Sequence, residues 1–238
     1  MPEIFDALRG VLLLLVEPDR TLLRVIALSL AVSLSATVMA AFLGLPLGAA
    51  LAVCRFAGRR AIIVMANALL GLPPVVVGLA LYMLLSRAGP LGALGLLFTP
   101  GAMVLAQFVL ATPIVTALVH RAMERIWAEF GPPLQIDGAG RLRAIPHLLA
   151  IGRPQVVTAL LAGFGRTISE VGAIIIVGGN IAGYTRTMTT TIVLETSEGN
   201  LSRALAFGLV LIAISIAVSA AAFAGDSRRP KTRGKDPE

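Results

Sequence analysis

Long runs of apolar residues, separated by short polar stretches, dominate the pattern along this chain. Five of these runs approach the roughly 20 residues that a helix needs to cross a bilayer core of about 30 Å. They cover residues 25–53, 61–85, 102–119, 156–177 and 204–224. Prolines within them, such as those at positions 73, 74 and 113, are tolerated in spanning helices that pack against neighbours. The pattern predicts an all-α polytopic membrane helix bundle with about five transmembrane helices over residues 25–224.

The two ends of the chain differ from this central region. Residues 1–24 place Ile4, Phe5, Leu8 and Leu12 at helical spacing, which predicts either an amphipathic helix on the membrane surface or an ordinary frayed terminus. The acidic start and the missing small-residue cleavage site argue against a secretory signal peptide. Residues 225–238 are polar and basic, and they predict a disordered cytoplasmic tail that anionic membrane lipid attracts.

Basic residues are unevenly distributed between the predicted loops. Of the 20 Lys and Arg residues, thirteen fall in the loops after the first and third runs and in the tail, and six fall on the opposite side. Cytoplasmic loops carry the basic excess in membrane proteins. We therefore expect the N-terminus outside, the C-terminus inside, and a multi-pass protein of the cytoplasmic (inner) membrane.

Composition narrows the class of protein further. Hydrophobic residues make up 57 % of the chain and charged residues only 14 %, with a mean hydropathy of +0.88. Soluble domains carry about 25 % charged residues, so a soluble enzyme or a nucleic-acid-binding domain is disfavoured despite the net charge of +7. We expect no nucleic-acid partner.

Few residues could carry chemistry. Cys54, His120 and His147 are the only cysteine and histidines, and they form no visible zinc ligand set. Lys231 and Lys235 are the only lysines, and neither stands in a phosphate-binding P-loop pattern. We therefore expect no metal or other cofactor on this chain, and any ATP-driven work requires a second chain.

The longest predicted cytoplasmic segment spans residues 120–155. It combines helical patterns over 122–130 and 141–150 with the breakers Gly131-Pro132-Pro133 between them. It contains too many apolar residues for disorder. Two interpretations remain open: helices that dock on a soluble partner, or helices that pack on the cytoplasmic ends of the bundle.

The fourth apolar run contains a pair of charges. Arg166 lies about ten residues into this run, which at 1.5 Å per residue is roughly 15 Å deep and near the bilayer midplane. A charge there costs about 2.5–3.5 kcal/mol, and Glu170, one helical turn later, can pair with it. Either the two form a buried ion pair that fixes helix packing, or Arg166, Ser169 and Glu170 face a water-filled path.

The segment after this run, residues 178–191, is dense in Thr and Gly and contains Arg186. Hydroxyls, backbone amides and a guanidinium suit a transient contact with an oxyanion, although a polar extracellular turn would have the same composition. The candidate residues of a translocation path are Arg166, Ser169, Glu170, Asn180, Arg186, Thr187 and Thr189.

These two segments resemble a known family. The run from Gly165 to Ala173, followed by Gly179-Asn-Ile-Ala-Gly183 and Thr185-Arg-Thr-Met188, resembles the permease subunits of type I ABC importers for molybdate and tungstate. Ser169-Glu170-Val171-Gly172 looks more like the tungstate permeases. The resemblance spans about residues 25–224 and implies an importer of an oxyanion, with tungstate favoured and molybdate or sulfate as alternatives.

The resemblance also implies an assembly. Permeases of this family form dimers, here a homodimer, that bind two copies of an ABC ATPase carrying ATP-Mg. A periplasmic or lipid-anchored oxyanion-binding protein delivers the solute. The family's coupling loop, E-A-A-x-x-x-G, matches at Gly138, whereas Pro132, Pro133 and Leu134 replace its E-A-A residues. The residues expected to couple to the ATPase are Gln135, Ile136, Asp137, Gly138, Ala139, Gly140, Arg141 and Leu142.

Two other classes of function find less support in the sequence. A membrane-embedded enzyme needs paired carboxylates, an activated nucleophile or a metal cluster, but Glu170 is the only acidic residue within the five runs. A stand-alone secondary transporter predicts an inverted repeat, and none is visible.

Overall fold

The structure is a computed structural model that describes residues 20–136 and 140–227, with side chains up to Gly225. Within these residues every regular element is a helix and no strand occurs. The helices are α2 (Arg20–Val53), α3 (Arg59–Ala68), α4 (Pro74–Leu85), α5 (Pro100–Ile136), α6 (Arg141–Ile151), α7 (Arg153–Ile168), α8 (Gly172–Gly178), α9 (Met188–Ser197) and α10 (Leu201–Ser227), with 3₁₀ turns at Leu69–Gly71 and Gly92–Leu94.

Some of the predicted features lie outside the described residues. These are the amphipathic pattern up to residue 19, the tail from residue 228 onward, and the coupling residues Asp137, Gly138 and Ala139. The boundary expected after residue 24 falls inside a helix, because α2 already begins at Arg20.

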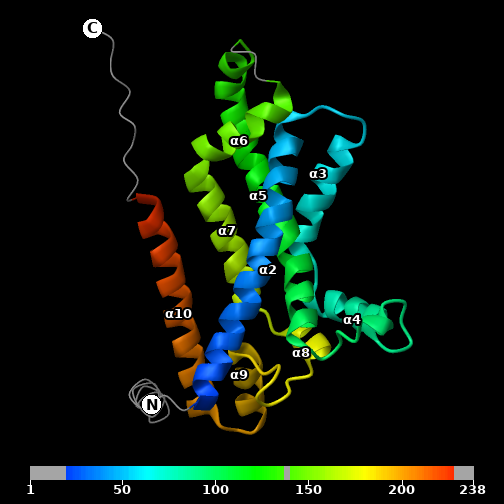
Figure 1. Ribbon diagram of the computed structural model, residues 1–238. Coiled ribbons are helices and arrows are strands. Elements are labelled where there is room, and N and C mark those ends of the chain that lie inside the picture. The colour runs from blue at the N-terminus through cyan, green and yellow to red at the C-terminus, as the bar shows by residue number, and fades with distance from the viewer. Residues whose placement is uncertain (1–19, 137–139, 228–238) are drawn as a thin grey trace.

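The all-α membrane bundle is confirmed. Within the described part of the chain, α2, α5 and α10 are each long and apolar enough to span a bilayer, and two bent pairs, α3 with α4 and α6 with α7, raise the number of candidate spans to five. The helices run roughly side by side, and α4 and α8 lie across the bundle axis (Figure 1).

The helices α2 and α5 form the centre of the bundle and pack against each other. A Cβ atom at Gly44 on α2 would lie 2.9 Å from Val115 Cγ1, and one at Gly48 would lie 2.7 Å from the carbonyl oxygen of Thr116. Glycine is therefore required at both positions, because only its missing side chain lets the two backbones approach so closely.

The second apolar run is sharply bent where the sequence has Leu72-Pro73-Pro74. Its two helices, α3 and α4, meet at 104°. Leu72 precedes Pro73 and adopts φ −59°, ψ 122°, because the ring of a following proline disfavours the helical region. Pro74 then occupies the first turn of α4, where a missing N–H does no harm.

The third run extends further than predicted. The breakers Gly131, Pro132 and Pro133 do not end the helix, and α5 continues to Ile136 as one element of 37 residues. Each proline removes one helical hydrogen bond. The carbonyl groups this frees belong to Ala128 and Glu129, which are exposed and can be hydrated. The expected separate helix over residues 122–130 is thus the end of α5.

The fourth run is also interrupted. Instead of one helix over residues 156–177, α7 ends at Ile168 and α8 begins at Gly172. α7 itself follows α6 with a bend of 79°. Arg166 therefore lies in the last turn of a helix rather than in the middle of one, and Glu170 lies beyond that helix end.

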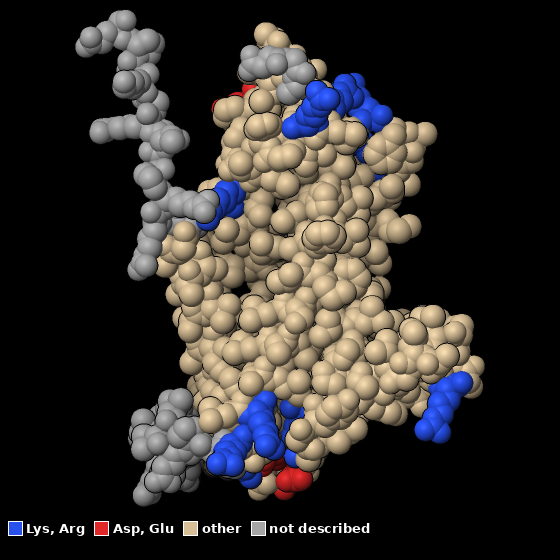
Figure 2. All heavy atoms as spheres, viewed as in Figure 1, with Lys and Arg blue, Asp and Glu red and all other residues tan. Residues whose placement is uncertain are grey.

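Charged side chains gather at the two ends of the bundle. At the end formed by α6 and the start of α3 lie Arg55, Arg59 and Arg60, and at the end formed by α9 and the starts of α2 and α10 lie Arg20, Arg24, Glu195, Glu198 and Arg203. Between them, the face in Figure 2 shows a wide band without a charged side chain. Such a band is what a bilayer core requires, since buried charge there is costly.

Candidate functional site

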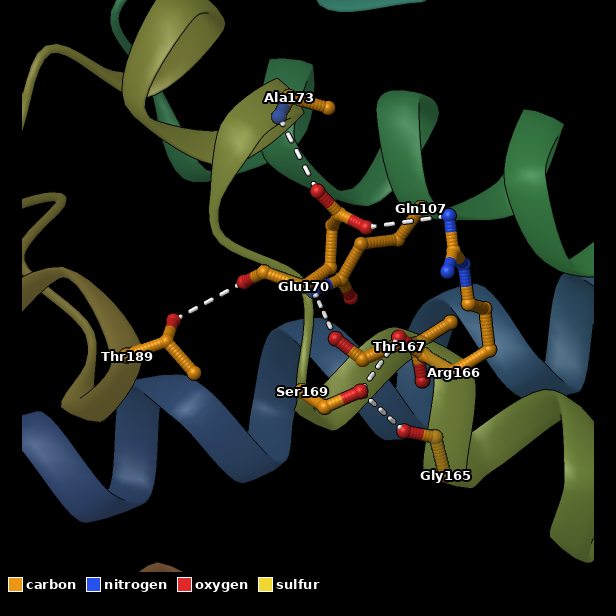
Figure 3. A network of polar contacts seen from close by, with 8 residues as sticks. All are labelled: Gln107, Gly165, Arg166, Thr167, Ser169, Glu170, Ala173 and Thr189. Atoms are coloured by element: carbon orange, nitrogen blue, oxygen red, sulfur yellow. Dashed lines mark hydrogen bonds and ion pairs between the residues drawn. The ribbon is translucent and has the colours of Figure 1, made fainter. Parts of the chain in front are cut away.

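The break between α7 and α8 lies between the two ends of the bundle (Figure 1). Polar side chains from α5, α7 and α9 surround it, together with Ser169 and Glu170 of the break itself (Figure 3). Irregular backbone at membrane depth persists only where it is buried in protein or lines a water-filled cavity. The partners of the freed backbone groups therefore decide what this region can do.

Glu170 is the centre of the network. Its carboxylate is only 5 % exposed, and Oε1 accepts a hydrogen bond from the N–H of Ala173 at 3.2 Å, in the first turn of α8. Oε2 lies 3.6 Å from Nη2 of Arg166. The pairing expected from the i, i+4 spacing is present, but it joins the end of α7 to the break instead of two turns of one helix.

Arg166 is the accessible member of this pair. Its side chain is 36 % exposed, compared with 5 % for that of Glu170. A guanidinium has five N–H donors, and the contact with Glu170 is the only ion pair recorded for it among the described residues. Arg166 therefore keeps guanidinium donors free, while the contact with Glu170 holds its orientation.

Gln107, on α5, is a site residue that the sequence analysis did not identify. It is 1 % exposed, and its Nε2 donates to the carbonyl oxygen of Thr167 at 2.8 Å. Its Oε1 is buried and has no partner within the described residues. The sequence did contain a signal for this residue: a glutamine stands in the middle of an apolar run, and a buried amide needs hydrogen-bond partners.

Ser169 and Thr189 satisfy other carbonyl groups at the break. Ser169 Oγ donates to the carbonyl oxygens of Gly165 at 2.7 Å and Arg166 at 3.3 Å. Such a local bond competes with the helical pattern. Thr189 Oγ1, at the start of α9, donates to the carbonyl oxygen of Glu170 at 3.0 Å. These hydroxyls therefore hold the break together.

In the part of the chain that the structure describes, the remaining candidates of the exit segment do not bond to the break directly, and Thr187 reaches it only through Thr189, whose hydroxyl lies 3.1 Å from its own. Thr187 caps α9, where its hydroxyl and that of Thr190 bond reciprocally to the backbone N–H groups; this is the capping-box arrangement. Asn180 adopts a left-handed conformation with φ 48°, and its Oδ1 is buried without a partner among the described residues. Arg186 lines a separate hollow between α2 and the α8–α9 loop.

In the segment from the end of α5 through α6, packing of α6 on the bundle is confirmed, whereas docking on a soluble partner stays a prediction. Ala144 and Leu148 of α6 are buried against the bundle, whereas Ile136 at the end of α5 is 86 % exposed and Leu142 at the start of α6 is 69 % exposed. Gln135 and Arg141 flank the tip, and Gly140 precedes α6. One face of α6 therefore packs on α2 and α5, and the tip presents apolar side chains outward.

The cationic group that the break can offer to a ligand is Arg166. No group of three or more His, Cys, Asp or Glu side chains converges within residues 20–136 and 140–227. The break instead offers one accessible guanidinium, oriented by a buried carboxylate. A guanidinium forms charge-assisted hydrogen bonds with oxyanions.

Comparison with known proteins places the chain among transporters. No family model matches it. It is 38 % identical over 220 residues to the tungstate uptake system permease protein of Peptoclostridium acidaminophilum, covering 92 % of this chain and 96 % of the relative. It is 37 % identical over 219 residues to a probable anion ABC transporter permease protein of Haloferax volcanii, covering 90 % and 94 %.

A molybdenum transport system permease protein of Azotobacter vinelandii is more distant, at 32 % identity over 209 residues, with 82 % of this chain and 90 % of the relative covered. All three relatives are named as transport permeases, and each matches nearly its whole length. The chain belongs to the family of ABC transporter permease subunits for anions, which includes the tungstate and molybdenum permeases.

Proposed function

We propose that this chain forms the translocation path of an ATP-driven importer for a tetrahedral oxyanion, tungstate in the first place. Two observations support the proposal: the similarity to a tungstate permease over 92 % of the chain, and an accessible arginine at a helix break inside an apolar bundle. Molybdate and sulfate are the alternatives of the same class, since they share the tetrahedral shape and double charge of tungstate.

The break is proposed as the low-affinity step of the path. A carrier must release its anion, so one half-exposed guanidinium is more suitable than a fully enclosed set of donors. Arg166 contacts the passing anion, while Glu170 fixes the guanidinium and limits the net positive charge. Gln107, Ser169 and Thr189 keep the broken backbone in shape.

The assembly is proposed from the family and from the surface of the chain. Large apolar side chains remain exposed on α2 and α4, among them Val38, Phe42, Val76 and Met83. A second copy of this chain and membrane lipid together cover these faces. We propose a homodimer in the inner membrane, with the α6 end of the bundle in the cytoplasm, as the basic excess there favours.

The α5–α6 tip is proposed as the contact with the ATPase. Exposed Ile136 and Leu142 suit insertion into a groove, and the packed face of α6 transmits its movement to α2 and α5. When the two ATPase copies bind ATP-Mg, they move together, and this movement switches the bundle from inward-open to outward-open. A binding protein outside the membrane then delivers the anion.

The test is uptake by the complete complex. The permease is reconstituted with its ATPase and binding protein, and ATP-dependent accumulation of tungstate is measured by elemental mass spectrometry. Wild type accumulates tungstate, whereas Arg166→Ala does so poorly while keeping its ATPase bound. Arg203→Ala is the matched control, because Arg203 pairs with Glu195 at the far end of the bundle. Undiminished uptake by Arg166→Ala contradicts its role, and absence of ATP-dependent uptake by wild type contradicts the function.

A further inference from the structure

At the end of the bundle that carries α9, a hollow of about 650 Å³ lies between the first turns of α2 and the α8–α9 loop. It is separate from the break described above. From α2 it is lined by Thr21, Arg24 and Leu28, and from the loop by Gly183, Tyr184 and Arg186. Two arginines far apart in the sequence thus face one concave surface.

Neither arginine is neutralised by the described residues. The side chains of Arg24 and Arg186 take part in no hydrogen bond or ion pair recorded within residues 20–136 and 140–227, and Nε of Arg186 is buried without a partner there. The acidic residue Glu195 at this end is instead paired with Arg203, at 3.4 Å. The hollow therefore keeps an uncompensated positive charge, which focuses the field on anions.

The loop that carries Arg186 is held in place by bonds to its surroundings. Thr185 Oγ1 donates to the carbonyl oxygen of Gly178 at 2.6 Å and accepts from the N–H of Ile181 at 2.9 Å. The N–H of Met188 then donates to Ser29 Oγ of α2 at 2.8 Å. The loop is thereby fixed against the helix that carries Arg24, so the hollow is formed before any ligand arrives.

The loop backbone adds donors. Gly183 adopts φ 72°, a left-handed conformation that exposes backbone amides, and Ala182 also lines the hollow. Within the described part of the chain, the N–H groups of Ala182 and Gly183 donate no hydrogen bond. Free amides beside guanidinium groups are the donor set that anion-binding loops use.

We propose that Arg24 and Arg186 form a capture site, at the mouth of the bundle, for the tetrahedral oxyanion that the binding protein releases, and Tyr184 lies at the rim of this site. The inference rests on the proposed function and adds to it a place where the anion is held before it reaches Arg166. Each guanidinium offers a planar pair of N–H donors that matches two oxygens of one anion. Because Arg24 is exposed and Arg186 only partly covered, binding is weak and the anion can move on.

Because Cys54 is the only cysteine of the chain, a single replacement gives a cysteine-free background for a thiol test. In a Cys54→Ala background, Tyr184→Cys places one thiol at the rim of the hollow. The full chain in phosphatidylcholine nanodiscs is treated with an anionic and with a cationic methanethiosulfonate reagent, and the two modification rates are compared. We expect the ratio of anionic to cationic rate to fall about tenfold when Arg24→Gln and Arg186→Gln are added. Arg60→Gln, which replaces an exposed arginine at the opposite end of the bundle, is the control and leaves the ratio unchanged.

The second measurement is protection. Millimolar tungstate should slow the anionic reagent severalfold with both arginines present, and not in their absence. A ratio that is equal in the double variant and in the control overturns the proposal. It is also overturned if tungstate has no effect while phosphatidylglycerol in the nanodisc protects the thiol, since the hollow then holds a lipid phosphate.

Uptake by the complete complex separates this inference from the function on which it rests. If the complex shows ATP-dependent uptake but tungstate does not protect the thiol, the capture site is contradicted and the importer function stands. Protection without ATP-dependent uptake supports the anion site and contradicts the importer.

Discussion

The bundle contains two helix breaks, and they differ in how the backbone N–H and C=O groups at the break are accommodated. Between α3 and α4 the chain turns through 104° at Pro73 and Pro74, and the side chains at the turn are apolar. Between α7 and α8 the chain breaks without a proline, and Gln107, Ser169, Glu170 and Thr189 bond to the backbone there.

The difference follows from the backbone. Proline has no N–H group, so a break made by two prolines leaves fewer donors to satisfy. A break made by ordinary residues leaves both N–H and C=O groups that must find partners away from water. Polar side chains at membrane depth are therefore a structural need at the second break, and Arg166 gains from them a carboxylate that orients it.

The largest expected effect comes from Glu170→Ala. It removes the acceptor for the Ala173 N–H and leaves Arg166 unpaired, so we expect a loss of about 2–3 kcal/mol in the free energy of unfolding. Uptake is lost with it. The measurement is unfolding by a denaturing detergent, with Glu124→Ala as control, since the more exposed Arg59–Glu124 pair contributes at most about 1 kcal/mol.

A charge exchange at the same pair separates packing from transport. If Arg166→Glu with Glu170→Arg recovers both stability and uptake, the pair serves only to fix the helices. Recovery of stability alone shows that the anion needs the guanidinium in its original place.

Thr189→Val is expected to have the next largest effect. It removes the hydroxyl that donates to the carbonyl oxygen of Glu170 and keeps the shape of the side chain. The free energy of unfolding should fall by about 1 kcal/mol. In the control, Thr196→Val, the lost hydroxyl bonds only to Ile192 within its own helix, so a change within about 0.5 kcal/mol is expected. Equal values for the two variants would show that Thr189 does not support the break.

Gln107→Leu has opposing effects on stability. It removes the donor to the carbonyl oxygen of Thr167, and it also removes Oε1, which is buried without a partner in the described residues. Each effect amounts to about 1 kcal/mol, so the detergent midpoint should hardly move. Uptake should nevertheless fall if Oε1 faces the path. Unchanged uptake in the stable variant assigns Gln107 to packing alone.

The smallest effect on uptake is expected at the proline break. Pro73→Ala keeps a residue that can adopt φ −67°, ψ 120°, so the main change is greater freedom of the unfolded chain, worth about 0.5 kcal/mol. Uptake should remain at the wild-type level. A loss as large as that of Glu170→Ala would mean that the two breaks depend on their side chains equally, contrary to the comparison.

The candidate site shows which contacts can be predicted from residue spacing along the sequence and which cannot. Arg166 and Glu170 are four residues apart, so their pairing could be predicted, and it occurs. Thr187 and Arg186 are neighbours in the sequence, yet one caps α9 and the other lines a hollow. Composition predicted a polar segment there, but the direction of each side chain depends on where the loop rests on α2.

The sequence by itself determined the all-α membrane class, the basic excess at one end and the pairing of Arg166 with Glu170, because apolar length, charge and helical spacing are local properties of the chain. Only the tertiary structure decided that α5 continues through Gly131-Pro132-Pro133, that Gln107 reaches Thr167, and that Arg24 and Arg186 line one hollow. Each of these depends on contacts between segments far apart in the chain, where burial and the need to satisfy every buried polar group outweigh local preference.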